Sequence, residues 1–289
     1  MLERIDFFAT DGALLNGILY KKNSKKVIIA VHGMSSHCMK ERDSIIAKTV
    51  NEKDISYFCF NNRGSELVRY VKIKEQKQLG GTTYEDVLDA YFDIKGAILK
   101  MKELGFEEIY LQGHSLGCTK IVYAYNKLKK ERDFAILRNL KGVMLLSLVD
   151  IPRALKIFTG EKFNEYLSLA ESKENEGKYY ELMPQTAFIH PISVKTYLRY
   201  CKYNEDIDFA KYHEKDFEVL NSISVPLFMR WGNVNEMIEQ DAKELSEMVN
   251  SAIDNENKDI SYVDGADHGY FGKEEELANQ ILEFINKNA

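Results

Sequence analysis

The sequence predicts an α/β fold with a mostly parallel central sheet, helices on both faces and a helical insertion. Three observations support this prediction. Short apolar runs alternate with segments of helical periodicity over most of the chain. One of these runs, KVIIAV at 26–31, is a continuous apolar strand, as expected when both faces of a sheet are covered, and GVMLLSLV at 142–149 is predicted to be a buried strand. Between 151 and 222 the alternation stops, and Lys, Glu and Tyr become frequent.

The strands are predicted from runs rich in Val, Ile, Phe and Tyr. In chain order they occupy 4–9, 14–20, 26–31, 55–60, 109–112, 142–149, 225–231 and 260–263. A turn at Asp11-Gly12 joins the first two, which predicts an opening strand pair. Most later strands are followed by a helical pattern, and this order predicts a parallel sheet.

The helices are predicted from apolar residues at helical spacing. They occupy 43–53, 84–104, 119–130, 238–249 and 274–285. The second of these has the clearest pattern. Thr83 and Asp86 predict a capping box at its start, and Gly105 predicts its end.

The break in the alternation predicts two structural units. Residues 1–150 and 223–289 form the predicted core, and 151–222 form a mostly helical insertion over one edge or end of the sheet. The loop at 62–78 carries five Lys or Arg against two Glu, and we expect it to be a solvated face, with contact to an anionic group as the alternative.

Composition narrows the class of protein. The 289 residues include 39 Lys plus Arg and 45 Asp plus Glu, a formal charge of −6, which argues against nucleic acid as a partner. The opening MLERIDFFATDGA lacks the apolar core of a secretion signal, and no apolar run has the length of a membrane span. The four cysteines lack metal-ligand spacing. We therefore expect a cytoplasmic protein with free thiols, without a structural metal or disulfide framework.

The segment YLQGHSLGCTK at 110–120 places a serine between two glycines, after a strand and before a helix. This order predicts a nucleophile elbow, in which Ser115 occupies a strained turn and Gly113 and Gly117 relieve the crowding around it. The helix start behind the serine also favours negative charge on a bound carbonyl oxygen. Taken alone the motif has low specificity, so its surroundings decide its meaning.

Two other segments supply what such a serine needs. Strand 26–31 runs into His32-Gly33-Met34, a turn whose backbone N–H groups can join that of Leu116 in an oxyanion hole. The last strand leads into DGADHG at 264–269, so His268 lies in a loop where a general base is required.

Together these motifs resemble the α/β-hydrolase family, from HG at 32–33 through GHSLG at 113–117 to GADHG at 265–269. The resemblance implies the α/β-hydrolase fold, with 151–222 as a helical cap or lid. It also implies that Ser115 attacks a carbonyl carbon, that His268 removes its proton, and that the N–H groups of Met34 and Leu116 hold the oxyanion. No organic cofactor or metal is required by this chemistry.

The acid of the triad departs from the family pattern. Asn235 stands where families of this type usually place Asp, three residues after Gly232. We predict that the neighbouring Glu236 is the acid. Asp150, at the end of strand 142–149, is the main alternative, and a weakened triad with Asn235 is another.

The expected function is that of a carboxylesterase acting on a small-molecule ester, thioester or amide. Asn235 motivates an alternative, a catalytically weak binding protein on the same fold, and an acyltransferase would share the same acyl-enzyme. His114 is expected to pack beside the serine, and His190 and His213 to be surface or satisfied groups. No motif specifies the substrate or the oligomeric state.

Overall fold

The computed structural model describes residues 1–288. Its central sheet has the strand order β1-β2-β4-β3-β7-β8-β9-β10. The bounds are β1 (Leu2–Phe8), β2 (Leu14–Tyr20), β3 (Lys26–Val31), β4 (Ser56–Asn61), β7 (Glu108–His114), β8 (Leu140–Leu146), β9 (Leu227–Gly232) and β10 (Lys258–Val263). β2 pairs antiparallel with both β1 and β4, and every other pairing in this sheet is parallel. All eight predicted strands are therefore present.

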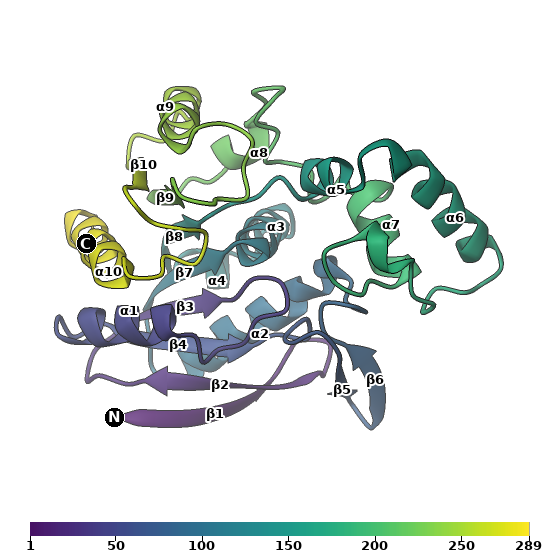
Figure 1. Cartoon of the computed structure of the whole chain (residues 1–289). Helices are drawn as coiled ribbons and strands as arrows, with labels where there is room; N and C mark the ends of the chain where they lie inside the picture. Colours follow the sequence, from purple (N-terminus) through teal and green to yellow (C-terminus); the bar gives the residue numbers. More distant parts are fainter. Residues whose placement is uncertain (289) are drawn as a thin grey trace.

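The helices cover both faces of the sheet (Figure 1). Their bounds are α1 (Glu41–Asn51), α2 (Ala90–Glu103), α3 (Leu116–Lys130), α4 (Phe134–Leu137), α5 (Ile151–Thr159), α6 (Phe163–Asn175), α7 (Val194–Cys201), α8 (Glu218–Asn221), α9 (Ala242–Ala252) and α10 (Glu274–Lys287). Short 3₁₀ helices occupy η1 (Val87–Asp89), η2 (Gly160–Lys162) and η3 (Gln185–Ala187). None of the helices in residues 1–288 combines the length and apolarity that crossing a membrane requires.

The sheet separates two hydrophobic cores, and β3 contributes to both. Val27, Ile29 and Val31 pack into the core that includes α2, α3 and α9. Ile28 and Ala30 pack into the opposite core, with α1 and α10. Because side chains alternate along a strand, a central strand with two covered faces needs an unbroken apolar run. This packing is the physical basis of the KVIIAV pattern.

The start of α2 differs from the prediction. The predicted capping box is absent, because Asp86 caps η1 by accepting from the Leu88 N–H at 3.2 Å, and α2 begins only at Ala90. The Thr83 hydroxyl instead donates to the Pro191 carbonyl at 2.9 Å. Gly105 ends the helix with a φ of +93°, as predicted.

The predicted solvated loop at 62–78 is wrong in two respects. It contains a hairpin of β5 (Arg69–Ile73) and β6 (Gln76–Gly80) outside the main sheet. Arg63 is not solvated, since its guanidinium is buried and pairs with Asp93 at 2.7 Å and Asp11 at 2.9 Å. Charge count along the chain could not reveal these partners, because both carboxylates come from other elements.

The stretch from 151 to 222 is mostly helical and adds no strand to the sheet. Figure 1 shows α5, α6 and α7 grouped together beside the ends of the central strands. The Thr83 contact joins this group to the core, and a further backbone bond runs from Ser193 N–H to Thr83 O at 2.9 Å.

Candidate active site

Ser115 lies in the turn between β7 and α3, with φ +54° and ψ −125°. A Cβ on Gly113 would lie 2.6 Å from the Cys118 nitrogen. One on Gly117 would overlap the Val31 carbonyl oxygen. Real Cβ atoms do not approach backbone so closely, so both positions require glycine. The two glycines allow α3 to pack against β3 and β7 while the serine is held at the tip of the turn.

The HG turn after β3 lies directly against this serine. A Cβ on Gly33 would be 2.9 Å from Ser115 Cβ, so the turn has no room for a side chain. Within the described chain, the N–H groups of Met34 and Leu116 donate no hydrogen bond to another protein group. Two unpartnered donors beside a serine are suited to bind a developing oxyanion.

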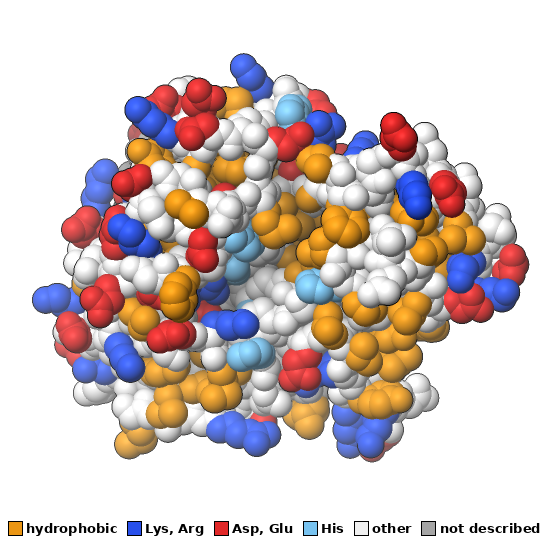
Figure 2. Space-filling model, in the orientation of Figure 1, with side chains coloured by type: hydrophobic (Ala, Val, Ile, Leu, Met, Phe, Trp, Pro, Cys, Tyr) orange, Lys and Arg blue, Asp and Glu red, His pale blue; other side chains and the backbone are white. Residues whose placement is uncertain are grey.

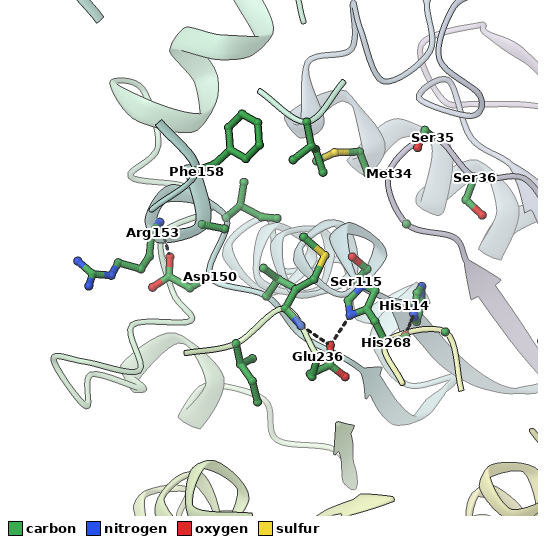
Figure 3. Close-up of a pocket in the computed structure, with 18 of the residues that line it drawn as sticks. Met34, Ser35, Ser36, His114, Ser115, Asp150, Arg153, Phe158, Glu236 and His268 are labelled. Carbon is green, nitrogen blue, oxygen red and sulfur yellow. Dashed lines mark hydrogen bonds and ion pairs between the residues drawn. The ribbon is translucent and has the colours of Figure 1, made fainter. Parts of the chain in front are cut away.

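His268 and Glu236 are in contact. The Nδ1 atom of His268 is hydrogen-bonded to Glu236 Oε1 (Figure 3). The Glu236 side chain is only 3% exposed, and its turn begins at the end of β9, the neighbour of β10. The left-handed φ of +51° at Asn235 belongs to this turn. Asn235, where the family pattern expects an acid, therefore shapes the turn. The next residue, Glu236, carries the carboxylate.

Backbone and side-chain donors surround the Glu236 carboxylate. Oε2 accepts from the Gly232 N–H at 2.8 Å and from the Ser147 hydroxyl at 2.8 Å, and Oε1 also accepts from the Met237 N–H at 3.0 Å. Burial alone raises the pKa of this carboxyl, but His268 and the donors outweigh it, so the pKa lies below its usual value. Glu236 is therefore ionised at neutral pH.

His114, the residue before Ser115, contacts the histidine loop. Its Nε2 lies 2.7 Å from the His268 carbonyl oxygen, and the two rings are 5.0 Å apart between centroids. Burial lowers the pKa of His114 well below its usual value, with the positive charge of Arg42 adding to the effect. A neutral His114 can donate from Nε2 to this carbonyl and hold the backbone of His268.

Ser115, His268 and Glu236 line one cavity of about 690 Å³, together with Met34. Figure 3 shows Ser115 and His268 side by side, with Glu236 on the side of the histidine away from Ser115. Figure 2 shows the hollow in this face of the molecule, with hydrophobic side chains along one wall. That wall is formed chiefly by α5 and the segment before α7, with Ile151, Ala154, Ile157, Phe158, Phe188 and Ile189.

The structure does not bring Asp150 to the histidine. Asp150 caps α5, where its carboxylate accepts from the Arg153 N–H at 3.0 Å (Figure 3). It lines the same cavity, but no hydrogen bond joins it to His268 in the part of the chain that the structure describes.

Asp150→Asn is expected to stabilise the protein at alkaline pH. Burial, with the nearby charge of Asp208, raises the pKa of Asp150 to about 6. A raised carboxyl pKa means that ionisation costs stability above pH 6, and that this cost is absent below the unfolded value near 4. With allowance for partial exposure, the free energy of unfolding of the variant at pH 8 should exceed that of the wild type by about 1 kcal/mol. Urea unfolding at pH 8 and pH 4 measures this difference, and a difference of equal size at both pH values would contradict this account.

Two histidines that were expected to be surface or satisfied groups both have polar partners, but their place at the cavity was not predicted. His190 lines the cavity and its Nε2 lies 3.1 Å from Ser35 Oγ, next to Met34. His213 also lines the cavity and pairs with Glu239. Neither histidine has a partner nearby in sequence, so no local pattern could identify them. Asp267 orders the histidine loop, with Oδ1 accepting from the Gly269 N–H at 3.0 Å.

In residues 1–288, no group of three or more His, Cys, Asp or Glu is arranged to hold a metal ion.

Cys118 is buried beside the elbow, and burial raises the pKa of its thiol well above the usual value. This cysteine is therefore a packed residue.

The order of the strands, the elbow after β7 and the histidine loop after β10 define the α/β-hydrolase fold. No family model matches the sequence, and neither does any curated protein. Solved structures do match, over nearly the whole chain. Est1E from Butyrivibrio proteoclasticus, bound to ferulic acid, is 18% identical with a TM-score of 0.68, and 98% of each chain is covered.

Two further structures agree with this assignment. The α/β hydrolase GrgF from Penicillium sp. sh18 is 16% identical with a TM-score of 0.69, covering 100% of this chain and 99% of its own. The carboxylesterase CesB from Bacillus subtilis is 18% identical with a TM-score of 0.55, covering 99% of this chain and 92% of its own. At these identities the likeness establishes the fold, and the predicted fold class is confirmed.

Proposed function

We propose that the protein is a serine hydrolase of the carboxylesterase type, which cleaves a small or medium ester, thioester or amide through an acyl-Ser115 intermediate. One observation supports this most strongly. The buried, ionised Glu236 contacts Nδ1 of His268, while the other side of that imidazole faces the cavity that Ser115 lines. This arrangement leaves Nε2 for a proton from the serine.

The first half of the reaction forms the acyl-enzyme. His268 Nε2 takes the Ser115 hydroxyl proton as Oγ bonds to the substrate carbonyl carbon, and the carbonyl π electrons move to its oxygen. The N–H groups of Met34 and Leu116 stabilise that oxyanion. When the tetrahedral intermediate collapses, the bond to the leaving group breaks, and the imidazolium gives its proton to the departing oxygen, sulfur or nitrogen.

The second half reverses these roles with water. His268 removes a proton from water as its oxygen bonds to the acyl carbon. Collapse then breaks the bond between that carbon and Ser115 Oγ, releases the acid, and lets the imidazolium return its proton to Oγ. Glu236 remains ionised throughout, holds the Nδ1–H tautomer and offsets the imidazolium charge. Each step uses only groups of this chain and solvent.

The shape of the cavity supports an apolar substrate group. Its wall on the side of α5 carries aliphatic and aromatic side chains, and we propose that residues 151–222 act as a cap that forms this wall. Est1E is described with ferulic acid bound and CesB as a carboxylesterase, which agrees with an ester substrate for this chain too. A panel of p-nitrophenyl esters of increasing length tests the depth of the pocket.

A fluorophosphonate probe tests the proposal directly. We expect stoichiometric labelling of the wild type and none of Ser115→Ala, because the probe reacts only with an activated serine. A folded wild-type protein that remains unlabelled would contradict the proposal and favour a binding role. Acyl transfer would appear as product formed with an added alcohol or amine at concentrations far below that of water.

A further inference from the structure

Ser147 contacts Glu236, the proposed acid, but belongs to none of the three motifs predicted from the sequence, the HG turn, the elbow and the histidine loop. It follows the last residue of β8, is fully buried, and its N–H donates to the Arg230 carbonyl of β9 at 2.7 Å. Its hydroxyl oxygen lies 2.8 Å from Glu236 Oε2. The serine therefore reaches the carboxylate from the end of β8, while the carboxylate lies in the turn that follows the neighbouring strand β9.

We propose that Ser147 is a positioning residue of the active site, whose hydroxyl holds Glu236 so that Oε1 faces His268. This inference rests on the function proposed above. The two carboxylate oxygens have separate partners, since Oε1 contacts His268 while Oε2 accepts from Ser147 and from the Gly232 N–H. Fixing Oε2 on one side restricts rotation of the carboxylate and keeps Oε1 on the other side toward the imidazole.

The proton on Ser147 has one favoured acceptor. Its oxygen also lies 3.0 Å from Tyr270 OH and 3.4 Å from the His268 carbonyl, but Glu236 Oε2 is the nearest and carries charge. A hydroxyl has one proton, and hydrogen bonds to charged acceptors are the stronger ones. Tyr270 OH can donate to the Arg230 carbonyl at 2.8 Å, so it does not need Ser147 as its acceptor.

The backbone conformation at Ser147 would suit glycine better, which indicates that a serine is present for its hydroxyl group. Its φ is +54°, a region that glycine adopts readily and other residues at a cost. Residues held in such conformations are concentrated at functional sites. Glycine would suit the backbone better than serine but would leave Oε2 without its side-chain donor.

Ser147→Gly separates the effect of the hydroxyl group from the effect of the backbone conformation. The variant loses one buried hydrogen bond and gains a residue suited to positive φ, so its melting temperature should stay close to that of the wild type. We expect kcat on a p-nitrophenyl ester to fall about tenfold with KM unchanged, since a lost hydrogen bond to a charged group is of that size. In proton NMR, the resonance of the His268 Nδ1–H should shift or broaden. A residue with a purely structural role would move the melting temperature and leave kcat of the folded fraction and this resonance unchanged.

Two other variants complete the test. Ser147→Ala removes the same hydroxyl but keeps the strain, so it should show the same fall in kcat with a lower melting temperature. Arg132→Gly is the matched control. Arg132 also has a positive φ of 55°, but it follows the C-terminal end of α3, whereas Ser115 precedes the N-terminal end of that helix. It should leave kcat unchanged.

The outcomes distinguish this inference from the proposed function. If wild type takes up the fluorophosphonate and Ser147→Gly turns over substrate as fast as wild type, the positioning role is wrong and the serine hydrolase remains. If the wild type itself is neither labelled nor active, the proposed function is wrong, and the positioning role falls with it.

Discussion

Glu236→Gln is expected to lower turnover by about 10⁴-fold, because a neutral amide does not offset the imidazolium charge and can hold His268 in the wrong tautomer. In the structure this carboxylate is the group that contacts Nδ1, and an amide can present an N–H to that nitrogen instead. Single-turnover acylation with a p-nitrophenyl ester measures the effect. Circular dichroism should show that the variant is folded, since Gln keeps the size of the side chain.

Asp150→Asn is the matched comparison for this prediction. It also neutralises a carboxylate that lines the cavity, but one that caps α5 and has no contact with His268. We expect acylation to change by less than about threefold, an energy difference under 1 kcal/mol. The reverse ranking, with Asp150→Asn as the crippled variant, would reassign the acid of the triad.

Gly117→Ala is expected to prevent the elbow from forming. The added methyl group would overlap the Val31 carbonyl oxygen and lie 2.9 Å from the His32 carbonyl oxygen. The Val31 oxygen belongs to β3, which is paired on both edges, so this oxygen cannot move aside without disturbing the sheet. We expect the free energy of unfolding to fall by at least about 3 kcal/mol, together with loss of fluorophosphonate labelling.

Gly105→Ala is the control for this substitution. Gly105 has a positive φ of 93°, but a Cβ there meets no atom within 4 Å. Only the backbone cost of about 1 kcal/mol should appear in urea unfolding, with labelling unchanged. If Gly117→Ala were as stable as Gly105→Ala, α3 and β3 would not be packed as closely as the structure indicates.

Sequence reasoning succeeded for features that are encoded locally. Strand β3 is recognisable because both of its faces are buried, and the elbow because Ser115 needs glycines two residues away on each side. Long helices were predicted in type and number, but their ends less well. The capping box predicted at the start of α2 is absent, because the Thr83 hydroxyl donates to the Pro191 carbonyl, while Asp86 caps η1 and also accepts from Arg199 of α7.

The partners of the site residues are set by contacts between distant elements. The Ser147–Glu236 bond joins residues 89 apart, and the Ser35–His190 contact joins residues 155 apart. Arg63 was misjudged for the same reason, since the aspartates that bury its charge lie in other elements. No periodicity or motif encodes such pairs.

The amino-acid order alone was sufficient to predict the α/β architecture and to nominate Ser115, His268 and Glu236, because steric demands and burial patterns act on neighbours in the chain. Which of the two carboxylates, Glu236 or Asp150, contacts His268 was decided only by the folded molecule, as were the locations of Ser147 and His114. Parallel pairing brings the carboxyl ends of β7, β8, β9 and β10 to one edge of the sheet, and there side chains from separate loops meet.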